Sequence, residues 1–210
     1  MKNRAFTLAE VVLVMVLMGI IAIALIRTVK VKDVQSKTDT VAAYKAINLF
    51  DQASFSLRDI DSTYAPTGAF IQKTGKTVKA DGSIEYSYER TINVSNAADI
   101  RNAFATYVKF DSTYDNFCTY SGYCDASETY PGGRIGDIYI GFELLENISD
   151  CPNFYMPEAE GEIAVREDLR TGIKPKCWAK IYIDTNGNKD PNTLGNDVYI
   201  FGIDELGLHH

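Results

Sequence analysis

Sixteen consecutive residues near the N-terminus are uncharged and almost all apolar, VVLVMVLMGIIAIALI at positions 11–26. Extended back to Phe6, the segment would form a helix of about 32 Å at about 1.5 Å per residue, enough to cross a bilayer core of about 30 Å. Glu10 lies inside this segment, and an ionised carboxylate in hydrocarbon costs about 2.5 kcal/mol or more. The pattern therefore predicts a membrane helix that carries one functional or paired acid.

Three interpretations fit this segment. In a secretory signal peptide, basic Lys2 and Arg4 would precede the apolar core, and the small residues Ala22 and Ala24 would mark a cleavage site. The second interpretation is an ordinary membrane anchor. Neither of these requires an acid at the start of the apolar run, so Glu10 favours a third kind of segment.

Residues 4–10, RAFTLAE, resemble the cleavage and methylation motif of type IV prepilins. In that family a short basic leader ends in a small residue, usually Gly, and the mature chain begins with Phe and has Glu as its fifth residue. Here Ala5 stands where Gly is usual, Phe6 would be the first mature residue, and Glu10 is the fifth. Gly19 matches the family's usual glycine, whereas the helix-kinking proline common near the end of the apolar segment is absent.

The resemblance implies a structural subunit of a type IV pilus or a type II secretion pseudopilus, not an enzyme. Such a subunit is cut after Ala5 by a prepilin peptidase and held in the inner membrane by one helix. The inner-membrane assembly machinery then moves it into a periplasmic or cell-surface fibre with other pilin-like subunits. The freed Phe6 amine and the Glu10 carboxylate of a neighbour would neutralise each other in the fibre core, because a buried charge needs a partner. The alternative is a minor subunit at the fibre tip that acts as a surface adhesin or binding module.

Residues 27–60 contain no Pro or Gly and are expected to continue the helix. Residues that recur mostly every three or four positions predict one buried face: Val34, Val41, Tyr44, Ile47, Phe50, Ser54 and Leu57. The opposite face carries Lys32, Asp39, Lys45 and Asp59. The chain thus divides into a leader (1–5), a membrane-spanning polymerisation half of the helix (6–27), an amphipathic half (28–60) and a head (61–210).

Turn residues from Asp61 onward predict shorter elements in the head. A proline and three glycines between positions 66 and 82 indicate a loop or a short hairpin, and residues 84–88 alternate as a strand does. Ser95 is expected to cap a second helix. The buried side of that helix would carry Ile100, Phe104 and Val108.

The second half of the head has the pattern of a sheet. Residues 111–133 have the composition of an irregular loop, whereas segments 137–144, 177–183 and 197–203 alternate and predict strands. A long N-terminal helix packed on a C-terminal antiparallel β-sheet makes the predicted fold α+β. The resemblance to pilins implies the same arrangement.

Four cysteines lie in the head: Cys118, Cys124, Cys151 and Cys177. An even number in an oxidising compartment suggests up to two disulfides, for which three pairings are possible. We expect Cys118–Cys124, which closes a small loop, together with Cys151–Cys177. Unpaired buried thiols remain the alternative, and the spacing of Cys118 and Cys124 does not fit a zinc knuckle.

The segment DTNGNKDPNTLGND at 184–197 separates two expected strands and alternates oxygen-bearing side chains. Such alternation resembles the start of a calcium loop. The candidate ligands are Asp184, Asn186, Asn188, Asp190 and Asp197. An EF-hand would need Gly at position 189 and Glu at position 195, where Lys and Gly stand, so only a different kind of calcium loop is possible. The other interpretation is a plain hairpin connection rich in turn residues.

Charge and histidine content exclude other functions. Residues 61–210 carry 13 Lys or Arg against 23 Asp or Glu, so no nucleic acid is expected as a partner, because phosphate binding needs basic clusters. The two histidines, His209 and His210, end the chain, where a terminal tail rarely holds an imidazole in place for catalysis. Neither an acid pair nor a nucleophile with a base can be assigned.

Overall fold

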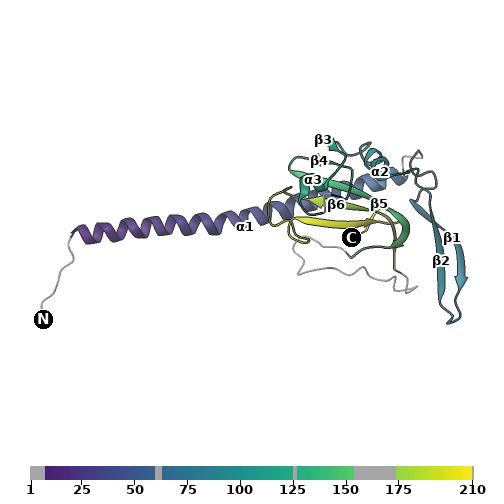
Figure 1. Cartoon of the computed structure of the whole chain (residues 1–210), viewed down its shortest axis with the longest axis horizontal. Coiled ribbons are helices and arrows are strands. Elements are labelled where there is room, and N and C mark those ends of the chain that lie inside the picture. Colours follow the sequence, from purple (N-terminus) through teal and green to yellow (C-terminus); the bar gives the residue numbers. More distant parts are fainter. Residues whose placement is uncertain (1–7, 60–62, 125–126, 154–173, 210) are drawn as a thin grey trace. The chain divides into compact units, whose positions relative to one another are not determined.

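The computed structural model describes residues 8–59, 63–124, 127–153 and 174–209, except for the side chains of residues 8–13 and 19–37 (Figure 1). The chain forms two units, Met1–Thr38 and Asp39–His210. The second unit contains both sheets, and we call it the head from here on. Its mixture of helices and antiparallel strands makes the fold α+β.

Helix α1 (Leu8–Asp59) has 52 residues. It passes through a stretch without Pro or Gly from residue 27 onward, so no helix-breaking residue interrupts the backbone hydrogen bonds there. Among the described residues, no helix is both long enough and apolar enough to cross a membrane.

The head half of α1 buries a face built partly from small residues. These buried residues are Ala43, Ala46, Ile47, Phe50, Ala53, Ser54 and Leu57. The prediction that Val41 and Tyr44 lie on the buried face is wrong, since their side chains are 54% and 36% exposed. Asp39, predicted on the polar face, is buried. The alanines explain why the buried face differs from the predicted one, because their short side chains let the helix approach the sheet closely. The spacing of the large side chains alone does not identify this face.

Two antiparallel sheets follow α1. The first contains β1 (Ile71–Val78) and β2 (Ile84–Arg90). The second has the order β3-β4-β5-β6-β7-β8. Its strands are β3 (Ser112–Tyr114), β4 (Gly132–Ile135), β5 (Ile138–Asp150), β6 (Lys176–Asp184), β7 (Val198–Ile203) and β8 (Leu208–His209). The expected strands at 84–88, 137–144, 177–183 and 197–203 are confirmed, and β1 shows that the preceding segment forms a hairpin.

Helix α2 (Ala97–Phe104) begins one residue later than predicted. Its N-cap is Asn96 rather than Ser95, and Asn96 forms a capping box with Asp99. The box satisfies backbone N–H groups that the first turn leaves free. Ile100, Phe104 and Val108 are buried, as expected.

The segment 111–133 is more regular than expected. It contains β3, the short helix α3 (Cys118–Ser121) and the start of β4. Gly132 and Gly133 mask the strand in the sequence because neither contributes a side chain to the alternation. Both must be glycine: a Cβ would lie 1.8 Å from the Ile140 carbonyl oxygen at position 132 and 2.5 Å from the Phe110 ring at position 133.

Aromatic side chains join α1 to the six-stranded sheet. The Phe50 ring lies 5.4 Å from that of Phe104 and 5.9 Å from that of Phe142, measured between centroids. Trp178 packs on Phe70 at 5.6 Å and donates its indole N–H to the Asp204 carbonyl at 3.1 Å. The buried indole therefore has its polar group satisfied.

Both expected disulfides are present. Cys118–Cys124 closes a short loop around α3, and Cys151–Cys177 joins the end of β5 to the start of β6. No free cysteine remains. The alternative of unpaired buried thiols is therefore wrong.

Candidate functional site

The processing residues lie at the edge of the described chain. Ala5 and Phe6 are outside the described residues, and α1 begins at Leu8. Glu10 lies in α1, but its side chain is also outside the description. The roles predicted for these three residues therefore stay predictions.

The segment 184–197 forms the connection between β6 and β7, and we call it the 184–197 loop. Asp184, the last residue of β6, accepts hydrogen bonds at Oδ1 from the backbone N–H groups of Asn186 (3.0 Å) and Gly187 (2.6 Å). This turn needs glycine, because residue 187 has a φ of +67° and a Cβ there would lie 2.7 Å from the Tyr139 ring. The Asp-x-x-Gly sequence thus explains how the loop leaves the sheet.

Asp197 organises the other end of the loop. It is buried just before β7, and its two carboxylate oxygens accept backbone N–H groups of Thr193 (2.8 Å) and Asn192 (2.9 Å). Asn188 and Asp190 are exposed. The five predicted ligands therefore have different environments, and only Asp184 and Asn186 combine burial with an oxygen that lacks a hydrogen-bond partner.

Three buried side-chain oxygens in this region make no hydrogen bond of good geometry, although the Ser121 hydroxyl lies near enough to the Asp184 carboxylate to oppose the rise in its pKa. They are Oδ2 of Asp184, Oδ1 of Asn186 and Oγ of Ser121, and they account for three of the five such side-chain atoms among the described residues. A buried polar atom without a partner costs about 1–3 kcal/mol. All three are oxygens, the atom type that calcium prefers as a ligand, so the donor set fits this ion.

Ser121 comes from α3 and was not predicted as part of the site. Two contacts bring its segment to the 184–197 loop. With its amide oriented to satisfy its surroundings, Asn192 donates to the Ser121 carbonyl (2.7 Å) and the Gly187 carbonyl (2.8 Å). A Cβ on Gly122 would lie 2.4 Å from Oδ1 of Asn188. In the sequence, only the short cysteine-closed loop indicated that this segment has a fixed shape.

The electrostatics of the loop favour a cation. Burial raises the pKa of Asp184 to about 6, and the Asp197 carboxylate adds to the rise, while Ser121 and the two turn amides oppose it. The pKa of Asp39 on α1 is also raised, first by burial and then by Asp197, against the opposing charge of Lys189. Asp197 thus lies close enough to Asp184 and Asp39 to raise the pKa of both.

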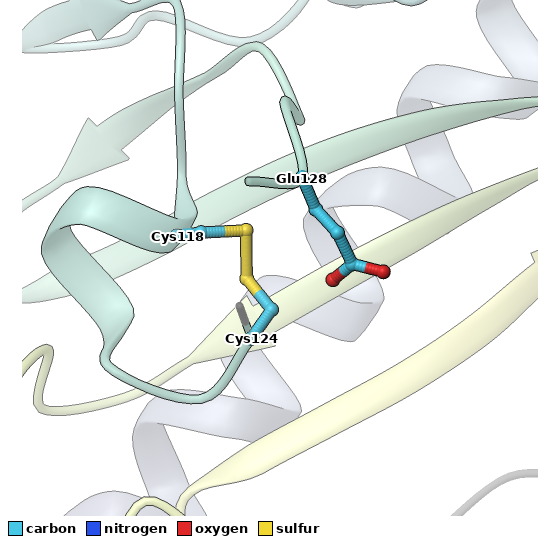
Figure 2. A group of neighbouring side chains, drawn as sticks. All are labelled: Cys118, Cys124 and Glu128. Carbon is cyan, nitrogen blue, oxygen red and sulfur yellow. A yellow bond between two sulfur atoms is a disulfide. The ribbon is translucent and has the colours of Figure 1, made fainter. Parts of the chain in front are cut away.

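A second group of potential ligands contains Cys118, Cys124 and Glu128, whose ligand atoms lie within 4.8 Å of one another. Figure 2 shows the two sulfurs joined to each other, with the Glu128 carboxylate beside them. Metal binding by cysteine needs a thiolate, and a disulfide offers none. While the two cysteines form a disulfide, Glu128 is the one anionic ligand that this group can offer to a metal ion.

His209 is held more firmly than a terminal tail was expected to be. It lies in β8, pairs with Gly202 of β7, and places Nδ1 3.1 Å from an Asp204 carboxylate oxygen. The strand pairing explains the difference, because it fixes the backbone up to the penultimate residue. His210 lies outside the described residues.

Comparisons with family models, with characterised proteins and with solved structures find no significant match.

Proposed function

We propose that this protein is a structural subunit of a type IV pilus or a type II secretion pseudopilus, polymerised through its N-terminal helix. The observation that carries the proposal is the RAFTLAE motif at residues 4–10, directly followed by sixteen uncharged residues. The motif combines a small residue before Phe6 with an acid in an apolar segment, and the acid needs a buried partner. The proposed location is the inner membrane before assembly and a periplasmic or cell-surface fibre afterwards.

The architecture of the head is compatible with this role. The part of α1 in the head contributes Phe50 to the core, and the six-stranded antiparallel sheet packs against the buried face of this helix. A pilin-like subunit needs such a head, because each copy must stay folded while its apolar helix moves from the membrane into the fibre. Two disulfides add stability by restricting the unfolded chain.

The mature N-terminus tests the proposal directly. Mass spectrometry of the protein purified from its native cells should find N-methylated Phe6 as the first residue, because the peptidase would cut after Ala5 and expose that amine. A chain that starts at Leu25 would instead indicate cleavage by signal peptidase and would refute the fibre role. A chain that keeps Met1 would indicate an ordinary anchor.

We also propose that the 184–197 loop binds calcium, with Asp184, Asn186 and Ser121 as side-chain ligands. The support is the set of three buried oxygens that lack hydrogen-bond partners, together with the raised pKa of Asp184. A bound cation would offset the desolvated carboxylate and stabilise the native state by RT ln(1 + [Ca]/Kd), about 2.7 kcal/mol at a hundredfold excess over Kd.

Calcium should therefore raise the melting temperature of the full chain in mild detergent by roughly 5–10 °C over chelator. The fluorescence of Trp178, the one tryptophan, reports unfolding of the head. Asp184→Asn keeps a hydrogen-bond acceptor for the turn and should remove the calcium response, and Ser121→Ala should weaken it. The rise should shrink at pH 5, because protons compete for a carboxylate whose pKa is about 6.

The matched control is Asp190→Asn, which removes the same charge from an exposed position of the same loop. It should leave the calcium response unchanged. Identical melting curves in calcium and in chelator would show that the loop is an ordinary connection. The fibre proposal would survive that result, because it rests on residues 4–26.

A further inference from the structure

The hairpin formed by β1 and β2 has two chemically different faces. Side chains alternate along a strand, and directly opposed residues share a face, so Ile84, Tyr86 and Tyr88 lie on one face. Their cross-strand partners join them there. The resulting basic face consists of Lys73, Lys76, Val78, Ile84 and Tyr86, whereas Tyr88, nearer the base of the hairpin, packs against the core of the head. The Lys73 ammonium lies 4.7 Å from the centre of the Tyr86 ring, as expected for neighbours on one face.

The opposite face of the hairpin is polar and acidic. It carries the two acids of these strands, Glu85 and Glu89, with Gln72, Thr77 and Ser87. Lys79, directly after β1, forms an ion pair with Glu85 at 3.4 Å. Gln72 donates a hydrogen bond to the Glu89 carboxylate. The basic face thus contains cations, a tyrosine and aliphatic residues but no acid.

The hairpin is anchored at its base and free at its tip. Ile71 is buried, and Arg90 donates to the carbonyl groups of Leu145 and Glu146 in β5. At the tip, Val78 is 64% and Ile84 41% exposed. Figure 1 shows the hairpin extending away from the six-stranded sheet, and within the described residues neither strand pairs with a third. A two-stranded hairpin is marginally stable alone, so a partner that covers the tip would stabilise it.

Charge separates the hairpin from the rest of residues 61–210. Residues 71–90 carry four Lys or Arg and three Asp or Glu, a net charge of +1. The remaining residues of 61–210 carry nine Lys or Arg and 20 Asp or Glu, a net charge of −11. We propose that the basic face of the β1–β2 hairpin docks on the acidic surface of a second copy of this chain.

This inference rests on the proposed fibre and names a surface that its subunits use. Contact between two different patches of identical chains is head-to-tail, and it propagates into a filament rather than closing into a dimer. An anionic polymer such as nucleic acid is a poorer partner, because the chain's net charge of −7 repels it. Opposite charges in turn set the orientation of the copies and the rate at which they meet.

The test compares two variants of the full chain that change its net charge equally. Lys73→Gln with Lys76→Gln removes two charges from the basic face, and Thr77→Glu with Ser87→Glu adds two acids to the opposite face. All four positions are exposed. The first variant should lower the yield of sheared fibres about tenfold and the second should not, since each ion pair contributes a fraction of a kcal/mol and about 1.4 kcal/mol is tenfold. Melting followed through Trp178 checks that both variants fold.

A photo-crosslinking residue at position 78 identifies the partner. It should yield dimers and higher multimers of this chain, with the second attachment point in its acidic surface. Attachment to another protein, the absence of self-crosslinks, or equal fibre yields from both variants would overturn the inference. So would binding of oligo(dT) that only the Lys73→Gln, Lys76→Gln variant loses. If mass spectrometry shows an unprocessed N-terminus, the fibre proposal fails separately, and self-crosslinks in detergent-solubilised chain still decide whether the hairpin pairs copies.

Discussion

Replacing Glu10 with valine should abolish fibre formation while leaving the head folded. In the proposed fibre, the Glu10 carboxylate neutralises the freed Phe6 amine of a neighbouring subunit in an apolar core. Removing one partner of a buried pair costs about 3–5 kcal/mol, because the other charge remains uncompensated. That amounts to a loss of roughly a hundredfold or more in the association constant at each contact. The measurement is the amount of this chain in sheared fibres relative to the amount in the membrane.

Two further variants locate the cause of that loss. Glu10→Gln keeps the size of the side chain and removes its charge, so it should also fail to assemble if the charge is the cause. Glu146→Val makes the same change at an exposed position of β5 and should assemble normally. Cleavage after Ala5 should continue in all three variants, since the peptidase acts before assembly. Normal fibre yield from Glu10→Val would refute the assembly role of Glu10.

Replacing Phe50 with alanine should lower the free energy of unfolding of the head by about 3–5 kcal/mol. Phe50 is fully buried, and its ring contacts those of Phe104 and Phe142 on α2 and β5. Truncation leaves a cavity where helix, sheet and α2 meet, and a rigid interior fills such a cavity incompletely. Since domains have about 5–15 kcal/mol of stability, the loss would be a large share. Denaturant unfolding in mild detergent, followed by Trp178 fluorescence, measures it.

The same substitution elsewhere on α1 provides the control. Phe55 is 55% exposed and meets the Arg58 guanidinium at 5.3 Å from its ring centre. Phe55→Ala should cost no more than about 1 kcal/mol, because only an exposed cation–π contact and a partly covered ring are lost. Equal losses from the two variants would mean that the helix does not form the core as described.

The sequence predicted the larger elements well because their periodicity is strong. The three late strands and the buried side of α2 follow from alternation and from helical spacing, and the favoured cysteine pairing was also correct. The buried face of α1 was placed too far toward Val41 and Tyr44. That error arose because Ala43, Ala46 and Ala53 carry little weight in a hydrophobic pattern, although close packing against a sheet selects small residues.

Short elements and contacts between distant segments could not be predicted from the sequence. Strands β3 and β4 contain few large apolar residues, and α3 has only four residues, so none of the three produces a recognisable hydrophobic periodicity. The loop between β6 and β7 was recognised from its oxygen-bearing residues, but they could not indicate which oxygens point inward. Ser121 joins that region only through tertiary contacts, such as the hydrogen bond that its carbonyl accepts from Asn192.

The Cys118–Cys124 bond also affects the 184–197 loop. Ser121 lies inside the ring that this bond closes, more than sixty positions before Asp184 in the chain. The Ser121 segment therefore joins the loop only after the last hairpin has been made, and the Cys118–Cys124 bond restricts the shape of that segment. If the loop binds calcium as proposed, a subunit in which the Cys118–Cys124 bond has not formed would hold Ser121 less firmly and bind the ion more weakly. Calcium affinity would in that case report whether this disulfide has formed.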